Sequence, residues 1–201
     1  MRLKVPFYKQ TTLLNCGPTA LRMALAYLDK DYGLEVLENK ARIREGKGIS
    51  TVQIATVAAS LGYRTTLFSK YILFNEENLK LDFYKNYNDM DLEQSKRWVE
   101  EAKAAGVKIE ERTLTLDELL SYVTKNSIPI VLVNWKIINE EKEKGYQGHF
   151  VPIVGYDDGN VYVHNAGLKN PQEFFPVKRE IFDEARKANG TDEDIIILYK
   201  K

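Results

Sequence analysis

Hydrophobic residues recur at helical spacing through the first third of the chain. Between about residues 17 and 29, Leu21 and Leu28 fall on one side of a helix and Arg22 falls on the other. The same reasoning predicts further helices over residues 34–44, 51–61, 91–105, 116–125 and 178–188. We therefore expect a helical lobe over about residues 1–62.

The second half of the chain changes to strand patterns. Residues 128–133 form a continuous apolar run rich in β-branched side chains, which is typical of a central strand buried on both faces. Shorter strands are expected over residues 64–68, 108–111, 149–154, 161–165 and 195–199. Helices followed by neighbouring strands predict an α+β fold, in which the helical lobe packs on an antiparallel sheet lobe over about residues 108–201 within a single domain.

Residues 70–106 have a weaker pattern, and we interpret them as an insertion or cap of undetermined structure. The first part of this segment is rich in tyrosine, asparagine and acidic residues without a clear period. Tyr71, Tyr84 and Tyr87 either pack the segment down, which is the commoner use of aromatic side chains, or line a substrate groove.

Charge and composition indicate which partners and which kinds of site are not expected for this chain. Basic and acidic side chains balance at 29 each in 201 residues, so nucleic acid is not an expected partner. The first ten residues lack the apolar core of a signal peptide and the longest apolar runs are strand-sized, which predicts a soluble, cytoplasmic protein without membrane contact. One cysteine and two histidines are too few for a convincing zinc site, so neither a metal nor a cofactor is expected. The oligomeric state is left open.

The single cysteine, Cys16, lies where the first predicted helix begins. Gly17 and Pro18 follow it and suit a helix start. Free backbone N–H groups and the positive end of the helix dipole converge there, and with a nearby histidine they would lower the pKa of the thiol and favour the nucleophilic thiolate. The alternative is that Cys16 is a small buried hydrophobic residue, which is what a lone intracellular cysteine usually is.

Both histidines fall in one predicted β-hairpin. His149 begins the outgoing strand, Asp158-Gly159 suits a tight turn, and His164 and Asn165 lie on the return strand. Matching the aliphatic clusters of the two strands places Asn165 on the face of His149, but this register needs an odd loop or a bulge. A strict two-residue turn would instead pair Ile153 with His164, so the sequence leaves the partner open and we favour the bulge.

These residues suggest nucleophilic catalysis. His149 would take the proton of Cys16 and return it to a leaving group, while Asn165 would hold the far ring nitrogen. The side-chain amide of Gln10 and the backbone N–H of Cys16 form a candidate pair of oxyanion donors. In the structural alternative, His149 would be a hydrogen-bonded residue at a strand end and His164 would be a surface residue. Gln10, taken alone, is not evidence for either alternative.

Together these residues resemble the papain-like cysteine peptidases. The likeness rests on Gln10, on NCGPTA from Asn15 to Ala20 at a helix start, on Gly148-His149, and on Asn165. It is closest to the bacteriocin-processing peptidases that cut leader peptides after a double glycine, and to their free-standing relatives. The resemblance implies a papain-like fold with Cys16 as nucleophile, His149 as base, Asn165 as orienting residue and Gln10 in the oxyanion hole.

Two departures from that family limit what the resemblance implies. The processing enzymes usually carry aspartate where this chain has Asn165, although papain-like enzymes in general use asparagine. Their transporter-linked members also carry membrane spans and an ATPase, which this sequence lacks. We therefore expect a cysteine hydrolase that cleaves a peptide or amide bond in a peptide or protein substrate. The alternatives are an acyl or peptidyl transferase on the same triad, and a non-catalytic peptide-binding module.

Overall fold

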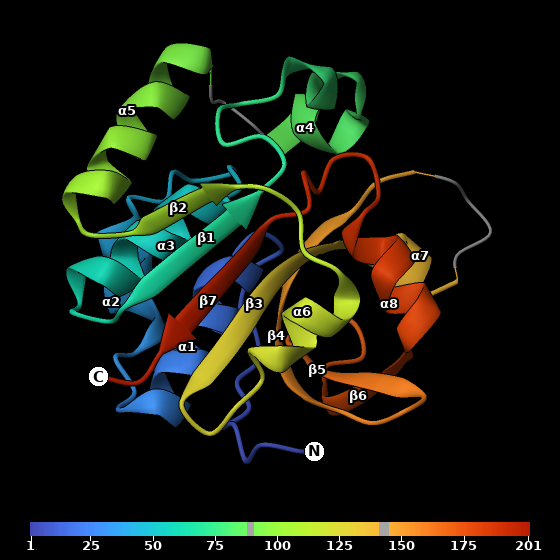
Figure 1. The fold of residues 1–201 in the computed structure, drawn as a ribbon. Helices are drawn as coiled ribbons and strands as arrows, with labels where there is room; N and C mark the ends of the chain where they lie inside the picture. Colours follow the sequence, from blue (N-terminus) through green and yellow to red (C-terminus); the bar gives the residue numbers. More distant parts are fainter. Residues whose placement is uncertain (88–90, 141–144) are drawn as a thin grey trace.

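The computed structural model describes residues 1–87, 91–140 and 145–201 of the chain (Figure 1). Its helices are α1 (Cys16–Leu28), α2 (Leu34–Ala41), α3 (Thr51–Ser60), α4 (Asp82–Tyr87), α5 (Leu92–Ala104), α6 (Leu116–Ser121), α7 (Trp135–Ile138) and α8 (Arg179–Arg186), with a 3₁₀ helix, η1 (Glu76–Lys80). Its strands are β1 (Thr65–Ser69), β2 (Lys108–Glu111), β3 (Ser127–Asn134), β4 (Gly148–Tyr156), β5 (Asn160–Asn165), β6 (Gln172–Lys178) and β7 (Ile195–Tyr199).

The described strands form one sheet in the order β2-β1-β7-β3-β4-β5-β6. Pairing is antiparallel from β1 to β6, as expected, but β1 and β2 pair in parallel. The expectation of a wholly antiparallel sheet was therefore wrong at this edge. The connection between the two strands contains α5, and a helical crossover of this kind returns the chain in the same direction.

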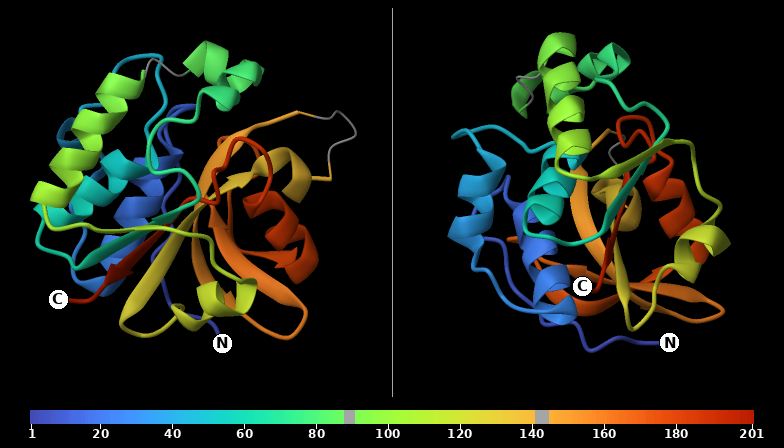
Figure 2. Two further views of the ribbon diagram at one scale, coloured as in Figure 1. Left: turned by 45° about the horizontal axis from the view of Figure 1, so that its top comes forward. Right: turned by 60° about the vertical axis from the view of Figure 1, so that its left-hand side comes forward.

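Helices cover both faces of the sheet. Figure 2 shows α1, α2 and α3 gathered on one side of the strands, and α7 and α8 on the other. The helix that begins at Cys16 packs on β3 and β4, while α8 packs on β3, β5 and β6. All eight residues of β3 are buried, as the apolar run 128–133 predicted, so this strand is the centre of the core. The molecule is the mixed α and β fold that the sequence predicted.

The β4–β5 hairpin contains the bulge that the sequence favoured. Near its turn, Tyr156 pairs with Val161 and Gly155 with Tyr162, which is the register of a two-residue turn. Beyond Val154 the register shifts by one residue, so that Ile153 pairs with Val163. A shift of one residue turns every following side chain to the other face. The bulge therefore decides which side chain of β5 faces His149.

The segment over residues 70–106 is mostly helical where it is described. It contains η1, α4 and α5, of which only α5 was predicted, and residues 88–90 within it lie outside the described part. Asp91 caps α5 by accepting a hydrogen bond from the Gln94 N–H at 2.7 Å, and α5 packs on α3. Figure 1 shows α4 and α5 above the ends of the strands. No helix in the described ranges combines the length and apolar character needed to cross a membrane.

Candidate active site

The loop that leads into α1 is held by Asn15. Its side-chain oxygen accepts hydrogen bonds from the backbone N–H groups of Thr11 and Thr12, at 3.2 and 3.1 Å, and its amide nitrogen donates to Glu38 at 2.8 Å. Asn15 is 2% exposed, so these bonds are shielded from water. This side chain fixes the path of the chain between Gln10 and Cys16, a role that the sequence reasoning missed.

Cys16 is the first residue of α1, and the backbone of β4 lies against it. The N–H groups of Phe150, Gly17 and Cys16 itself act on the sulfur to lower the pKa of the thiol. Glycine at position 17 permits this close fit, because a Cβ there would lie 2.7 Å from Ile54 Cδ1 and 3.2 Å from the Phe150 ring and would force these side chains to shift. Since Phe150 follows His149 on β4, this packing brings the thiol and the imidazole to the same part of the sheet.

His149 and Asn165 are joined as predicted. His149 Nε2 lies 3.1 Å from Asn165 Oδ1, which also accepts the backbone N–H of Gly167 at 3.0 Å. The amide nitrogen of Asn165 donates to the carbonyl of Asn170 at 3.0 Å, so the amide can face in only one direction. His149 Nε2 must therefore carry the proton, and Nδ1 is left as the basic nitrogen. In the described part of the chain, no hydrogen bond joins His149 to Cys16.

The aromatic side chain of Trp135 covers His149, and Phe175 packs behind it. The ring of Trp135 lies edge-on to the His149 imidazole with centroids 4.8 Å apart, and the Phe175 ring lies 5.7 Å from that of Trp135. Trp135 is 7% exposed and follows directly after β3. It excludes water from the imidazole and so strengthens the bond to Asn165. The sequence signal for it was an aromatic residue at the end of the central strand, which was not used.

Burial sets the pKa values of the candidate pair, in the direction opposite to the one expected. Removal from water raises the pKa of the Cys16 thiol, despite the backbone N–H groups around it. Burial likewise lowers the pKa of His149 to about 4, although its bond to Asn165 acts the other way. Burial of Cys16, which is only 8% exposed, thus opposes the thiolate that the helix start was predicted to favour. Both pKa shifts favour the neutral forms, a thiol and an imidazole.

Gln10 lies close to the segment after Asn165, since its backbone N–H donates to the carbonyl of Ala166 at 3.0 Å. Its side-chain nitrogen donates to the carbonyl of Thr12 at 2.8 Å, and the contact with the Leu13 carbonyl is longer, at 3.5 Å. The side-chain oxygen is buried without a partner. Both contacts occupy the amide nitrogen, so a Gln10 N–H would serve an oxyanion only by leaving the longer contact with the Leu13 carbonyl.

His164 is part of the core and not part of the site. Its Nε2 lies 3.0 Å from the carbonyl of Val5, and its Nδ1 accepts the backbone N–H of Phe174 at 3.1 Å. Both ring nitrogens are used, the residue is fully buried, and burial lowers the pKa of the imidazole. The structural alternative, which made His164 a surface residue, was wrong on this point. From β5, the side chain of His164 instead ties the N-terminal segment to β6 as a neutral imidazole.

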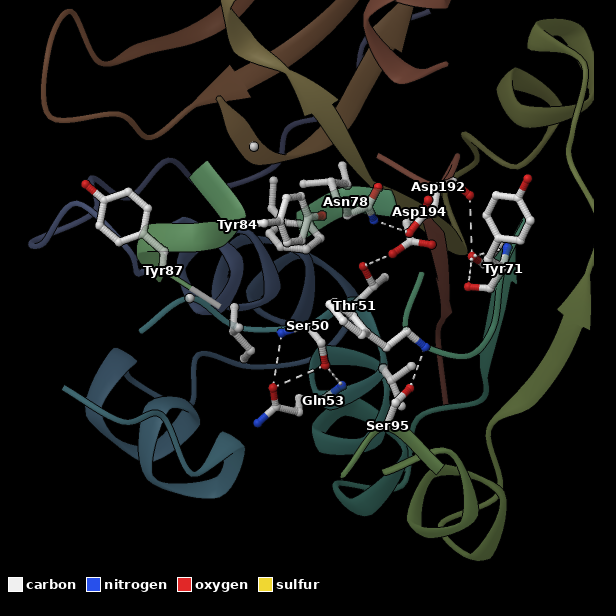
Figure 3. Close-up of a pocket in the computed structure, with 18 of the residues that line it drawn as sticks. Ser50, Thr51, Gln53, Tyr71, Asn78, Tyr84, Tyr87, Ser95, Asp192 and Asp194 are labelled. Carbon is white, nitrogen blue, oxygen red and sulfur yellow. Dashed lines mark hydrogen bonds between the residues drawn. The ribbon is translucent and has the colours of Figure 1, made fainter. Parts of the chain in front are cut away.

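A pocket opens beside Cys16, between the start of α3 and the 70–106 segment (Figure 3). Tyr71, Tyr84 and Tyr87 line this pocket. Their position matches the second alternative given for them, in which they line a groove. Two carboxylates, Asp192 and Asp194, also line it and were missed, because only the fold brings the loop before β7 to this place. Within the described residues, no group of three or more histidine, cysteine or acidic side chains is arranged to hold a metal ion.

Comparison with known proteins places the sequence in a family. A family model described as guanylylate cyclase matches residues 5–198. The chain belongs to the guanylylate cyclase family. A curated relative, guanylyl cyclase 1 of Arabidopsis thaliana, is 24% identical, with the match covering 98% of this chain and 76% of that protein. The sequence reasoning did not foresee this family.

Solved structures similar to this guanylylate cyclase family chain are cysteine peptidase domains. A C39-like peptidase from Bacillus anthracis has a TM-score of 0.61 at 16% identity, covering 98% of this chain and 96% of that one. The peptidase domain of Streptococcus ComA, a bifunctional ABC transporter, has a TM-score of 0.52 at 16% identity, covering 96% and 97%. A double-glycine protease from an AMS/PCAT transporter, solved with its leader peptide, has a TM-score of 0.52 at 18% identity, covering 99% and 93%. The papain-like, bacteriocin-processing peptidase-like fold predicted from the sequence is confirmed.

Proposed function

We propose that this chain is a cysteine-dependent hydrolase of peptide or amide bonds. The observation that carries the proposal is the bond between Asn165 Oδ1 and His149 Nε2, because it leaves Nδ1 as an oriented base on the strand whose Phe150 N–H contacts the Cys16 sulfur at the start of α1. The peptidase-like fold supports the same reading. Peptide or protein chains are the proposed substrates.

The proposed reaction has two halves. His149 Nδ1 takes the thiol proton as Cys16 Sγ attacks the carbonyl carbon, and the imidazolium then gives that proton to the amine as the C–N bond breaks. The product of this half is a thioester on Cys16. A water molecule then loses a proton to His149 and attacks the thioester, which releases the carboxylic acid and returns the thiol. The Gln10 amide N–H that leaves the Leu13 carbonyl and the backbone N–H of Cys16 are the proposed oxyanion donors.

The neutral resting pair defines the role of His149. A thiol with a raised pKa and an imidazole with a pKa of about 4 do not exchange a proton at rest. His149 therefore acts as a general base during the attack, and Cys16 is not a stored thiolate. The positive end of α1 and the backbone N–H groups around the sulfur stabilise negative charge as it develops.

Two alternatives use the same residues. An acyl or peptidyl transferase would pass the thioester to an amine in place of water, and added amines would then appear in the product. A peptide-binding module would hold its ligand without cleavage, and the Cys16→Ala variant would bind as tightly as the parent while the parent forms no product.

Guanylyl cyclase activity is a second candidate function, and the family match favours it. Cyclisation of GTP requires groups that hold a triphosphate, which in proteins are arginine, lysine or clustered backbone N–H groups. None of the described side chains that line the pocket beside Cys16 is lysine or arginine, and two are aspartates. The charge of this pocket therefore favours the amide hydrolase.

One experiment separates these functions. The parent, Cys16→Ala and His149→Asn proteins are incubated with a proteome-derived peptide mixture, and new N-termini are counted by mass spectrometry. In parallel they are incubated with GTP and Mg²⁺ or Mn²⁺, and cyclic GMP is measured. We expect cleavage by the parent alone and no cyclic GMP. Cleavage that persists in Cys16→Ala contradicts the hydrolase proposal, and cyclic GMP formed by the parent supports the cyclase.

A further inference from the structure

The pocket beside Cys16 has an acidic end. We use the name acidic end for Asp192, Asp194, Thr51, Tyr84 and Tyr146, all of which line the pocket. Figure 3 shows the labelled side chains of Asp192 and Asp194 next to each other on the pocket wall, with Thr51 and Tyr84 nearby. Cys16 lines the same pocket, so a molecule held at the acidic end can extend to the thiol.

Neutral side chains are the hydrogen-bond partners of both carboxylates. Asp192 accepts from the side-chain amides of Asn75 at 3.2 Å and Asn78 at 2.8 Å. Asp194 accepts from the hydroxyl of Thr51. These donors orient the carboxylates but supply no positive charge. The charge that the structure records acting on Asp192 comes from Lys70, an exposed residue outside the pocket lining.

Tyr146 adds an unused polar group to this end. The residue is 9% exposed, and its buried hydroxyl makes no hydrogen bond of good geometry, although it lies close enough to the Tyr84 hydroxyl to act on the pKa of that group. Its ring stacks on that of Tyr84 with centroids 5.5 Å apart, and the Tyr84 hydroxyl donates to the carbonyl of Gly190 at 2.6 Å. A buried hydroxyl normally finds a partner, so the Tyr146 oxygen is suited to accept an N–H from a bound molecule.

The described lining of the pocket contains carboxylates and aromatic rings but no lysine or arginine. A lining of this composition suits a positively charged organic group. An organic cation is attracted by both aspartates and by the rings of Tyr84 and Tyr146. We propose that the acidic end binds the ammonium or guanidinium group of the substrate. Resting on the proposed function, this makes the substrate a peptide or amide with a basic group near the bond that Cys16 attacks.

The protonation of Asp194 agrees with this occupant. Burial and the neighbouring Asp192 raise the pKa of Asp194 to about 7, while Thr51 and Ser69 lower it. The other titratable groups of the lining are Cys16 and the tyrosines, and Lys70 lies outside. A bound cation favours the charged carboxylate, so binding should release a proton and strengthen as the pH rises from about 6 to about 8.

The test measures binding without chemistry, in the Cys16→Ala background. The probes are the Nα-acetyl methylamides of lysine, arginine and norleucine, and the signals are calorimetry and the fluorescence of Trp98, which lines the pocket. We expect the lysine or arginine probe to bind at least about tenfold more tightly than norleucine, which matches lysine in shape but carries no charge. The two cationic probes distinguish an ammonium from a guanidinium site. Equal affinity for norleucine, or no binding of any probe, overturns the proposal.

Variants identify the groups responsible. Asp192→Asn and Asp194→Asn should each weaken cation binding about tenfold, and Tyr146→Phe, which keeps the ring, should weaken it severalfold. Asp82→Asn is the control, since it makes the same charge change at a carboxylate that is 88% exposed on α4. Thermal melting checks each fold, and Tyr146→Phe decides the question if an aspartate variant unfolds. An equal loss in Asp82→Asn overturns the site.

The cation site and the proposed hydrolase function can each be contradicted without the other. If the cationic probes bind but the parent protein never acylates Cys16, the hydrolase is contradicted and the cation site stands. If Cys16 is acylated but the probes do not discriminate by charge, the cation site is contradicted and the hydrolase stands.

Discussion

Two polar clusters can be compared, one around Asn165 and His149 and the other at the acidic end of the pocket that Cys16 lines, and their polar atoms are satisfied to different degrees. Around Asn165 every polar atom of the amide has a protein partner, so the orientation of His149 is set before any substrate arrives. At the acidic end, Asp192 and Asp194 meet neutral donors, and the Tyr146 hydroxyl makes no hydrogen bond of good geometry. Fixed orientation suits a reacting group, whereas unbalanced charge suits a ligand that balances it. The cluster around Asn165 is therefore suited to reaction, and the acidic end is suited to recognition.

The largest effect should come from removing the nucleophile. Cys16→Ala should lower turnover by about 10⁴-fold or more, because the bond-forming atom is gone. Its stability should change by only about 1 kcal/mol, since one small buried group is lost. Product formation by mass spectrometry and thermal melting measure the two effects. Turnover at the parental rate would contradict the assignment.

The two histidines should respond in opposite ways. His149→Asn should lose turnover by about 10³-fold or more because the Nδ1 base is removed, and it should also lose some stability because Asn165 Oδ1 loses its Nε2 partner. His164→Asn should keep the rate per folded molecule but lose about 1–3 kcal/mol of stability, because the Val5 carbonyl and the Phe174 N–H lose a partner. Urea unfolding and turnover on the same samples test the pair. A stable, inactive His164→Asn would reverse the assignment.

Neutralising Asp194 should stabilise the protein at high pH. Its folded pKa of about 7 lies above the ordinary 3.8, so the folded state binds this proton more tightly. The benefit is present below about pH 4 and is lost as the pH rises to about 7. Asp194→Asn should therefore gain up to about 4 kcal/mol at about pH 8 and almost nothing at about pH 4. Urea unfolding at both values measures the difference, with Asp82→Asn as the control, and a gain independent of pH would contradict it.

The smallest effect is expected for Asn165→Asp. The new carboxylate would replace the amide N–H that donates to the Asn170 carbonyl, which should cost about 1–3 kcal/mol. It would also raise the pKa of His149 from about 4, so the acid limb of the rate should move up by about one pH unit. Asn126→Asp on an exposed turn is the control. An unmoved acid limb would show that Asn165 does not act on His149.

The sequence predicted the parts of the site that depend on local pattern. Cys16 begins α1, and a bulge places Asn165 beside His149, as the aliphatic faces of the hairpin indicated. It did not predict the direction of the pKa shifts, because these follow from burial by distant segments. Strand β6, which supplies Phe175, also went unrecognised because its side chains are mostly exposed or half-buried.

The other site residues that the sequence did not predict were also missed because only tertiary packing brings them to the site. Asp192 and Asp194 lie more than a hundred residues from Tyr84 in the sequence, and only the folded chain brings them together. Trp135 directly follows the central strand, and the sequence alone does not show that its ring covers His149. Residue types and local periodicity therefore predict where reactive groups lie along the chain, while the sheet decides what surrounds them.

The most direct test of the central claim is the acylation of Cys16. The parent, His149→Asn and His164→Asn proteins are mixed with p-nitrophenyl acetate at neutral pH, and the adduct is located by intact mass and peptide mapping. We expect rapid acetylation of Cys16 in the parent and in His164→Asn, and acetylation at least about 10²-fold slower in His149→Asn. Acetylation of Cys16 at the same rate in all three proteins, or no adduct on Cys16 in the folded parent, would contradict the proposed pair.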